Sequence, residues 1–119
     1  MADARQLRTA LAGLHRELLE VQRREAEKIG GRMSRTELLQ AAADDLRFDW
    51  LRILSTLIVE LDDGIREDDR PGVEAAVDRA RALLDPPDQT TAFGARYLSM
   101  LQTQPAVVMA HRDVTAALR

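Results

Sequence analysis

Cysteine is absent from this chain. Disulfide bonds, thiolate catalysis and sulfur-ligated metal centres are therefore excluded together. Aromatic residues make up only 3% of the sequence, so a hydrophobic core must be built from aliphatic side chains. No run of 18 apolar residues is present, and we expect no membrane-spanning helix. Lys28 is the only lysine among 17 basic residues, and this arginine excess indicates a high-GC coding bias before any role in phosphate binding.

The rest of the composition is that of an ordinary globular protein. Hydrophobic residues account for 45% of the 119 positions, which is enough for one self-sufficient core in a single domain. The formal charge of −3 gives no electrostatic reason to expect a nucleic-acid partner. Charged residues occur from Asp3 onward, so we expect no signal peptide. A cytoplasmic location is expected, since cysteine is absent.

The first helix is predicted from Ala4 to Ile29. Asp3 is a suitable N-cap, and the pair Gly30 and Gly31 provides a stop. At about 1.5 Å per residue this helix is roughly 39 Å long. Its apolar residues alternate at steps of four and three, which is heptad spacing. These residues are Leu7, Leu11, Leu14, Leu18 and Val21.

A second helix is predicted from Ser34, because Ser34 and Glu37 have the spacing of a capping box. A third helix starts between Leu46 and Trp50 and ends near Glu67. It is the most apolar segment, and we expect it at the centre of the fold with other helices on more than one side. Its apolar stripe holds Trp50, Leu51, Leu54, Leu57, Ile58, Leu61 and Ile65, and Ile53 and Val59 widen it.

Three further helices are predicted at residues 71–84, at residues 90–103 and from Pro105 onward, separated by breaks rich in Asp and Pro. No alternating β pattern is present. The sequence therefore predicts an all-α fold: a single compact helical bundle of five to six helices over residues 1–119. The inward-facing residues expected in these helices are Val73, Val77, Ala80, Leu84, Phe93, Tyr97, Leu98, Leu101, Val107, Val108, His111, Val114 and Leu118.

Two blocks of the sequence carry a resemblance to a family. They are F-x-W-L-R-x-L-S-x-L-I-V at residues 48–59 and P-x-V-V-x-A-H at residues 105–111. With shorter matches around His15, Glu37 and Arg96, the chain resembles a family of small bacterial all-helical proteins with no known activity. That family has a proline where this chain has Ile53, which places a helix start near Trp50. The resemblance implies a helical bundle of bacterial origin, and it implies no catalytic residues.

The two histidines are the first candidate ligand-binding residues. His15 lies beside the stripe of the first helix and His111 lies in the last helix, and such terminal helices can pack together so that the imidazoles meet. A metal site in a helical bundle usually needs several carboxylates, often as Glu-x-x-His. Ala12 and Val108 occupy the positions where that motif needs Glu. We therefore expect no metal and no cofactor, and favour two partly buried histidines bonded to a carbonyl or carboxylate.

Aromatic and charged residues near Trp50 offer a second candidate site. Arg52 and Asp49 are three residues apart and can pair on one helix face. With Arg47, they can form either a polar rim around a pocket floored by Trp50 or only a local ion pair at the helix entrance. We favour the ion pair. Tyr97 can line such a pocket, or can be a core residue with its hydroxyl at the surface.

Other sites are not supported by the sequence. The carboxylates at residues 60–69 lack the Gly and Glu positions of a calcium loop. Ser55 and Ser99 have no glycine-rich elbow, and Gly30 and Gly31 do not form a phosphate loop. A helix-turn-helix in residues 34–67 is disfavoured because its second helix is too apolar to be an exposed recognition helix.

These observations predict a non-enzymatic helical interaction or regulatory module, most simply a homodimer in a bacterial cytoplasm. It would have a possible protein partner, but no nucleic-acid or membrane partner. The alternative is a small-ligand- or metal-binding bundle that uses His15 and His111. A regulator that binds another protein through a polar surface cannot be separated from the first reading by sequence.

Overall fold

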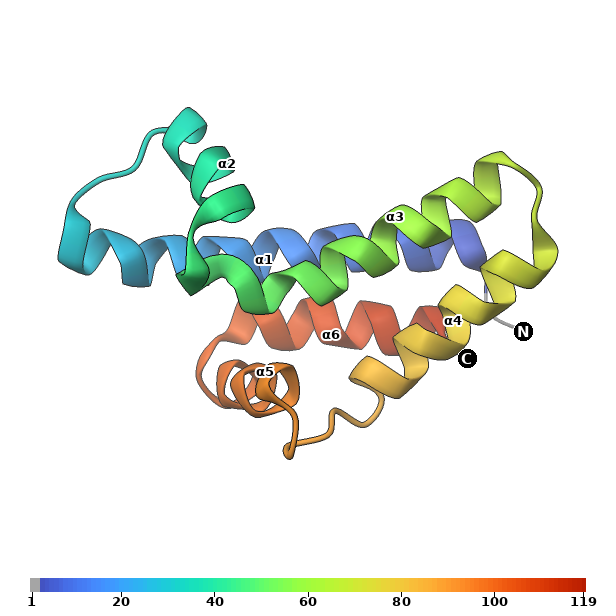
Figure 1. Cartoon of the computed structure of the whole chain (residues 1–119). Helices are drawn as coiled ribbons and strands as arrows, with labels where there is room; N and C mark the ends of the chain where they lie inside the picture. The colour runs from blue at the N-terminus through green and yellow to red at the C-terminus, as the bar shows by residue number, and fades with distance from the viewer. Residues whose placement is uncertain (1–2) are drawn as a thin grey trace.

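The computed structural model describes residues 3–119, so Met1 and Ala2, which the expected domain includes, lie outside the described residues. Residues 3–119 form α-helices and one 3-10 helix, η1, without a strand (Figure 1), and the predicted all-α bundle is confirmed. The bounds are α1 Ala4–Gly30, α2 Arg35–Asp44, η1 Leu46–Leu51, α3 Arg52–Arg66, α4 Arg70–Leu84, α5 Ala92–Thr103 and α6 Pro105–Ala117.

The longest helix, α1, forms the axis of the bundle. The helix α6 runs antiparallel beside it, and α3 packs along another side (Figure 1). The Asp3 side chain accepts the backbone N–H groups of Arg5 and Gln6 at the start of α1, which satisfies donors that the helix leaves unpaired. Gly31, with φ of 80°, ends it. The predicted stripe is confirmed, since Leu7, Leu11, Leu14, Leu18 and Val21 are all buried.

The helix α3 supplies the middle of the core, as predicted, but only two of its sides are covered. Leu54, Leu57 and Leu61 are buried against α1 and α4, while Trp50 and Ile58 are half-buried at the edge of the same core. The prediction that Ile53 and Val59 widen the buried stripe is wrong, because their side chains are 53% and 57% exposed. The third side of α3 has no helix packed on it.

The last three helices complete the core with one correction. The residues Ala80, Leu84, Phe93, Tyr97, Val107, Val114 and Leu118 are buried, while Val73, Val77, Leu98, Leu101 and His111 are half-buried. Val108, predicted to face inward, is 42% exposed. It lies one residue beyond the buried Val107, and a one-residue step turns a helix by about 100°.

The segment before α3 is a 3-10 helix, so the α-helix begins at Arg52 and not between Leu46 and Trp50. The Asp45 side chain accepts the N–H of Arg47, and the Asp45 carbonyl accepts the N–H of Phe48. In a 3-10 helix, side chains three residues apart lie on the same side. Phe48 and Leu51, three residues apart, are both buried.

The helix α2 stands away from the rest of the bundle (Figure 1). The predicted capping box is present, since Ser34 accepts the N–H of Glu37 and the Glu37 carboxylate accepts the N–H of Ser34. None of its ten residues is buried. It contacts the remainder of the bundle mainly through η1. The start of α2 is therefore well specified, whereas its packing is limited to the half-buried Leu38, Ala41 and Ala42.

No helix in residues 3–119 is long and apolar enough to cross a lipid bilayer.

Candidate functional site

Four side-chain rings form a continuous row between η1, α5 and α6, here called the aromatic row. Trp50 lies 5.7 Å from Phe93, Phe93 lies 5.4 Å from Tyr97, and Tyr97 lies 5.5 Å from His111, measured between ring centroids. Phe93 and Tyr97 share one face of α5 because they are four residues apart. Pro105 starts α6 directly after α5, and the resulting helical hairpin brings His111 back to Tyr97.

The last pair of the aromatic row is a hydrogen bond between Tyr97 and His111. The hydroxyl of the fully buried Tyr97 lies 2.6 Å from His111 Nδ1. Burial raises the pKa of Tyr97 and lowers the pKa of His111, although the charge of Asp85 raises the latter. Both groups are therefore neutral near pH 7. The Tyr97 hydroxyl donates to Nδ1, because accepting from it would leave the hydroxyl proton buried without an acceptor.

The other end of the row is fixed by Gln22, which sequence reasoning missed. Gln22 of α1 is 2% exposed, and its Oε1 accepts one hydrogen bond of 2.9 Å from Trp50 Nε1 and another from Arg96. The Arg96 guanidinium also lies over the Trp50 ring, 5.2 Å from its centroid, and 3.6 Å from the Glu25 carboxylate. A cation over an indole face is a favourable arrangement. We call these four residues the Gln22 cluster, and they join α1, η1 and α5.

His15 forms a hydrogen bond with a residue of α3, whereas His111 forms its hydrogen bond with a residue of α5. The Nε2 of His15 lies 2.9 Å from the Ser55 hydroxyl, which joins α1 to α3, and burial lowers the pKa of His15. Ser55 also lies 3.3 Å from the Leu51 carbonyl. Each imidazole is thus bonded to a hydroxyl group, and not to the carbonyl or carboxylate that we expected. No hydrogen bond joins the two imidazoles in the described part of the chain.

Arg52 lies outside the aromatic row. It pairs with Asp49 at 3.1 Å, as predicted, and donates a 3.1 Å hydrogen bond to the Ala43 carbonyl. Arg47 pairs with Asp45 and not with Asp49. Of the five candidate ligand-binding residues, the structure therefore brings together Trp50, Tyr97 and His111, and places His15 and Arg52 elsewhere.

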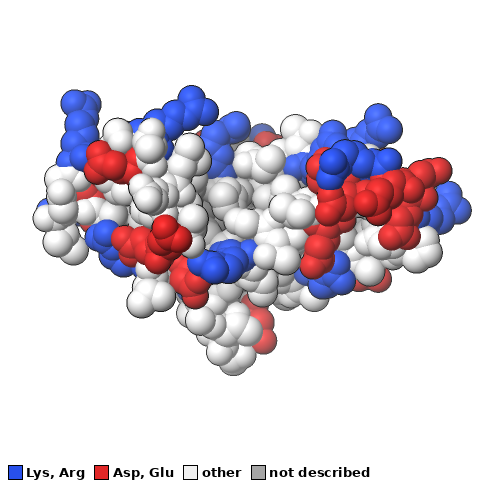
Figure 2. Space-filling view, turned by 45° about the horizontal axis from the view of Figure 1, so that its top comes forward, with Lys and Arg blue, Asp and Glu red and all other residues white. Residues whose placement is uncertain are grey.

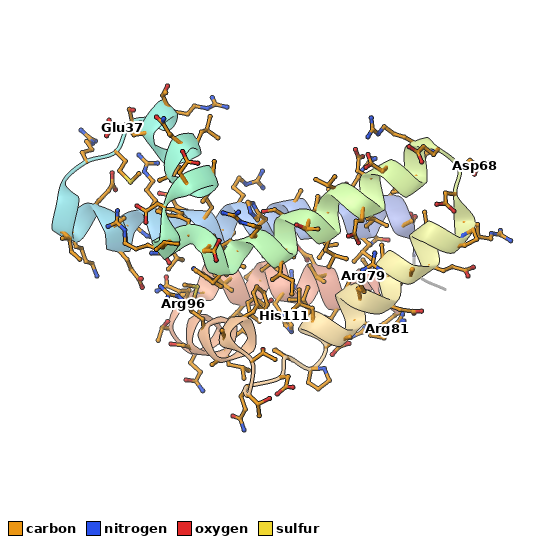
Figure 3. All side chains as sticks on the ribbon, in the orientation of Figure 1. Glu37, Asp68, Arg79, Arg81, Arg96 and His111 are labelled. Carbon is orange, nitrogen blue, oxygen red and sulfur yellow. The ribbon has the colours of Figure 1, made fainter. Side chains whose placement is uncertain are left out.

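In the aromatic row, Phe93 and Tyr97 are buried, and Trp50 and His111 at its two ends are half-buried. None of the five main grooves is lined by Trp50, Phe93, Tyr97 or His111. Arg52 borders a groove of about 590 Å³ between α3 and α4. Within residues 3–119, no three His, Asp or Glu side chains gather closely enough to hold a metal ion. The aromatic row joins η1, α5 and α6, and the Gln22 cluster joins α1, η1 and α5. Figure 3 labels Arg96 of the cluster and His111 of the row.

Comparison of the chain with models of protein families, with curated proteins and with solved structures finds no match. The resemblance carried by residues 48–59 and 105–111 therefore stays a prediction.

Proposed function

We propose that this chain is a non-enzymatic helical interaction module that acts as a homodimer. The observation that carries the proposal is α2, a ten-residue helix with no buried residue. Helices shorter than about 12–15 residues are marginal when they stand alone in water. Capping stabilises the start of α2, but packing contributes little within one copy. A partner that covers α2 supplies the missing burial.

The exposed apolar surface supports the same proposal. Large apolar side chains that remain exposed occur at Ile29 near the end of α1, Leu39 in α2, Leu46 in η1, and Ile53 and Val59 in α3. Uncharged surface lies between charged groups in the middle of the view in Figure 2. Val108 and Met109 of α6 are exposed as well. Single exposed apolar residues are common, but several on elements that contact one another, as α2, η1 and α3 do, are typical of a protein-binding surface.

The interior gives no support to an enzymatic reading. Its polar groups bond to one another: Tyr97 to His111, Ser55 to His15, and Gln22 to Trp50. Among residues 3–119, neither of the two hydroxyl–imidazole pairs, Ser55 with His15 and Tyr97 with His111, lines one of the five grooves, whereas nucleophilic catalysis requires an accessible pair. A bacterial cytoplasm, the setting that we infer from the sequence, fits a module without cysteine.

The proposal is tested by measuring the molar mass in solution. The chain has a mass of 13.3 kDa, and sedimentation equilibrium at micromolar concentration should give about twice this value. A monomer mass that does not change when the concentration rises tenfold would remove the homodimer.

A further inference from the structure

The two ends of the molecule carry different charge. Lys28, Arg32 and Arg35 lie at the end of α1 and the start of α2, and residues 28–36 contain no carboxylate. At the α3–α4 end, residues 60–78 contain eight carboxylates and only two arginines. Figure 2 shows this acidic surface on the right, and Figure 3 labels Glu37 of α2 and Asp68 at opposite ends. The molecule is 44 Å long, so the two charged ends are well separated.

The basic end is also an uncovered apolar surface. We define the arm as residues 28–39: the end of α1, the connecting loop and the first half of α2. Ile29 is 86% exposed and Leu39 is 61% exposed. The arm thus combines two exposed apolar side chains with three basic ones and a single carboxylate, Glu37, and α2 buries none of its own residues.

A groove at the opposite end has complementary properties. It is a groove of about 590 Å³ between the start of α1 and the helices α3 and α4, and we call it the acidic groove. Its apolar lining includes Ile65, Val73 and Val77, and its charged lining has five carboxylates against three guanidinium groups. The charged residues are Asp3, Asp68, Asp69, Glu74, Asp78, Arg5, Arg70 and Arg81.

We propose that the arm of one copy docks in the acidic groove of a second copy, so that a two-fold antiparallel dimer contains two such contacts. This inference rests on the proposed homodimer and names the surfaces that form it. Apolar residues of the arm would cover the lining of the groove, and Arg32 and Arg35 would face its carboxylates. Charge complementarity of this kind fixes the orientation and register of partners.

The antiparallel arrangement follows from the position of the two surfaces. Because the arm and the groove lie at opposite ends (Figure 1), an antiparallel pair places the arm of each copy at the groove end of the other. A parallel arrangement would bring the two acidic ends together. A single head-to-tail contact would leave one arm free and continue into a filament, whereas a two-fold interface closes after two copies.

The structure suggests two charge-reversal variants that test this docking. The arm variant is Arg32→Glu with Arg35→Glu. Arg35 is the first residue of α2, where a negative charge favours the helix, so the variant should fold. The groove variant is Glu74→Arg with Asp78→Arg, two exposed positions of α4. Asp69 is left unchanged because its side chain caps α4 through the N–H of Gly72.

Each variant alone should be a monomer, because both contacts of its homodimer would oppose like charges. An equimolar mixture of the two variants should recover a dimer of about twice the monomer mass. In that mixed dimer the acidic arm meets the basic groove, and the remaining arm and groove keep their original charges. The control Arg16→Glu with Arg112→Glu changes the net charge as the arm variant does, but at exposed positions outside both surfaces. It should remain a dimer.

Sedimentation equilibrium measures the masses, and circular dichroism confirms that each variant keeps its helix content. If the original protein and both variants are all dimers, another face forms the dimer, so this inference is overturned while the proposed function stands. If the variants are monomers and their mixture stays monomeric, the inference is also overturned. An original protein that is a monomer would remove the homodimer itself.

Salt provides a measurement that needs no variant. Raising the salt concentration from about 0.05 to about 0.5 M shortens the range of charge interactions. The dissociation constant of the original dimer should then rise at least tenfold. A dissociation constant that is unchanged over this range would overturn the docking of arm and groove even if a variant failed to fold.

Discussion

Replacing Gln22 by leucine should destabilise the protein although it makes the core more apolar. Gln22 is 2% exposed, and its Oε1 is the acceptor for both Trp50 Nε1 and Arg96. The change removes that acceptor and leaves two donors without this partner. Leucine has a similar volume, so we expect neither a large cavity nor a severe clash.

The magnitude follows from the two hydrogen bonds. A neutral bond such as that from Trp50 contributes about 1 kcal/mol, and a bond that involves a charged group contributes about 1.5–3 kcal/mol. Arg96 is 43% exposed and also faces Glu25. Water and that carboxylate therefore compensate for part of the stabilisation lost with the hydrogen bond from Arg96 to Gln22. The apolar side chain that enters the core offsets a further part. We therefore expect a net loss of about 1.5–2 kcal/mol in the free energy of unfolding.

The assay is urea unfolding followed by circular dichroism at the helix band. Fluorescence of Trp50, the only tryptophan, is recorded in parallel, because loss of its hydrogen bond changes the emission even where stability does not change. Gln102→Leu is the matched control, since Gln102 is exposed on α5 and should change stability by no more than about 0.5 kcal/mol. If Gln22→Leu also costs less than about 0.5 kcal/mol, the Gln22 cluster does not hold the three helices together.

Three other predictions concern the core, pH and metal. Leu57→Ala should lower the free energy of unfolding by about 2–5 kcal/mol in a urea melt, because Leu57 is 4% exposed; a cost below about 1 kcal/mol would contradict the central position of α3. Burial lowers the pKa of both His15 and His111 below the ordinary value of 6.5, so their stabilising contribution is present above about pH 6.5 and is lost as the pH falls through the lowered values. Urea melts between about pH 8 and pH 5 should show this fall, and it should be smaller in a variant with both histidines replaced by glutamine. Elemental analysis of the purified protein should find no stoichiometric transition metal; near one equivalent of zinc, iron or manganese that is lost in His15→Ala would instead support the ligand-binding alternative.

Local signals in the sequence predicted the helix ends well. Asp3, the pair Gly30 and Gly31, and the capping box of Ser34 and Glu37 act within four residues of their own position, so the helix ends follow from the local sequence. The stripe of α1 was also correct, because its polar residues leave only one face to bury. These features depend little on what lies elsewhere in the chain.

The side of α3 that stays exposed could not be predicted from its sequence. Apolar residues surround most of this helix, so its periodicity does not say which of them face a neighbour. Ile53 and Val59 are exposed because α1 and α4 occupy the other two sides. The periodicity of residues 46–51 likewise did not predict the 3-10 geometry of η1, which buries Phe48 and Leu51.

Three of the candidate ligand-binding residues lie together in the aromatic row, and their binding of a ligand stays a prediction. These residues are Trp50, Tyr97 and His111. Pro105, which separates α5 from α6, was a signal in the sequence that Tyr97 and His111 lie on neighbouring helices. Gln22 was missed although one signal was present: it lies four residues after Leu18, on the buried face of α1. The only tryptophan of a small core needs an acceptor for its indole N–H, and a buried glutamine is suited to that role.

The polar groups of the interior have hydrogen-bond partners, whereas parts of the surface are left uncovered. Inside, hydroxyl, imidazole, indole and amide groups bond to one another and join α1 to α3, to η1 and to α5. A buried polar pair of this kind favours one packing of the helices, since separating the partners leaves a group without a hydrogen bond. At the surface, α2 buries no residue, and within residues 3–119 the acidic groove leaves Ile65, Val73 and Val77 only partly buried. The exposed surfaces that we propose a second copy covers lie at the two ends of the molecule, in the arm and in the acidic groove.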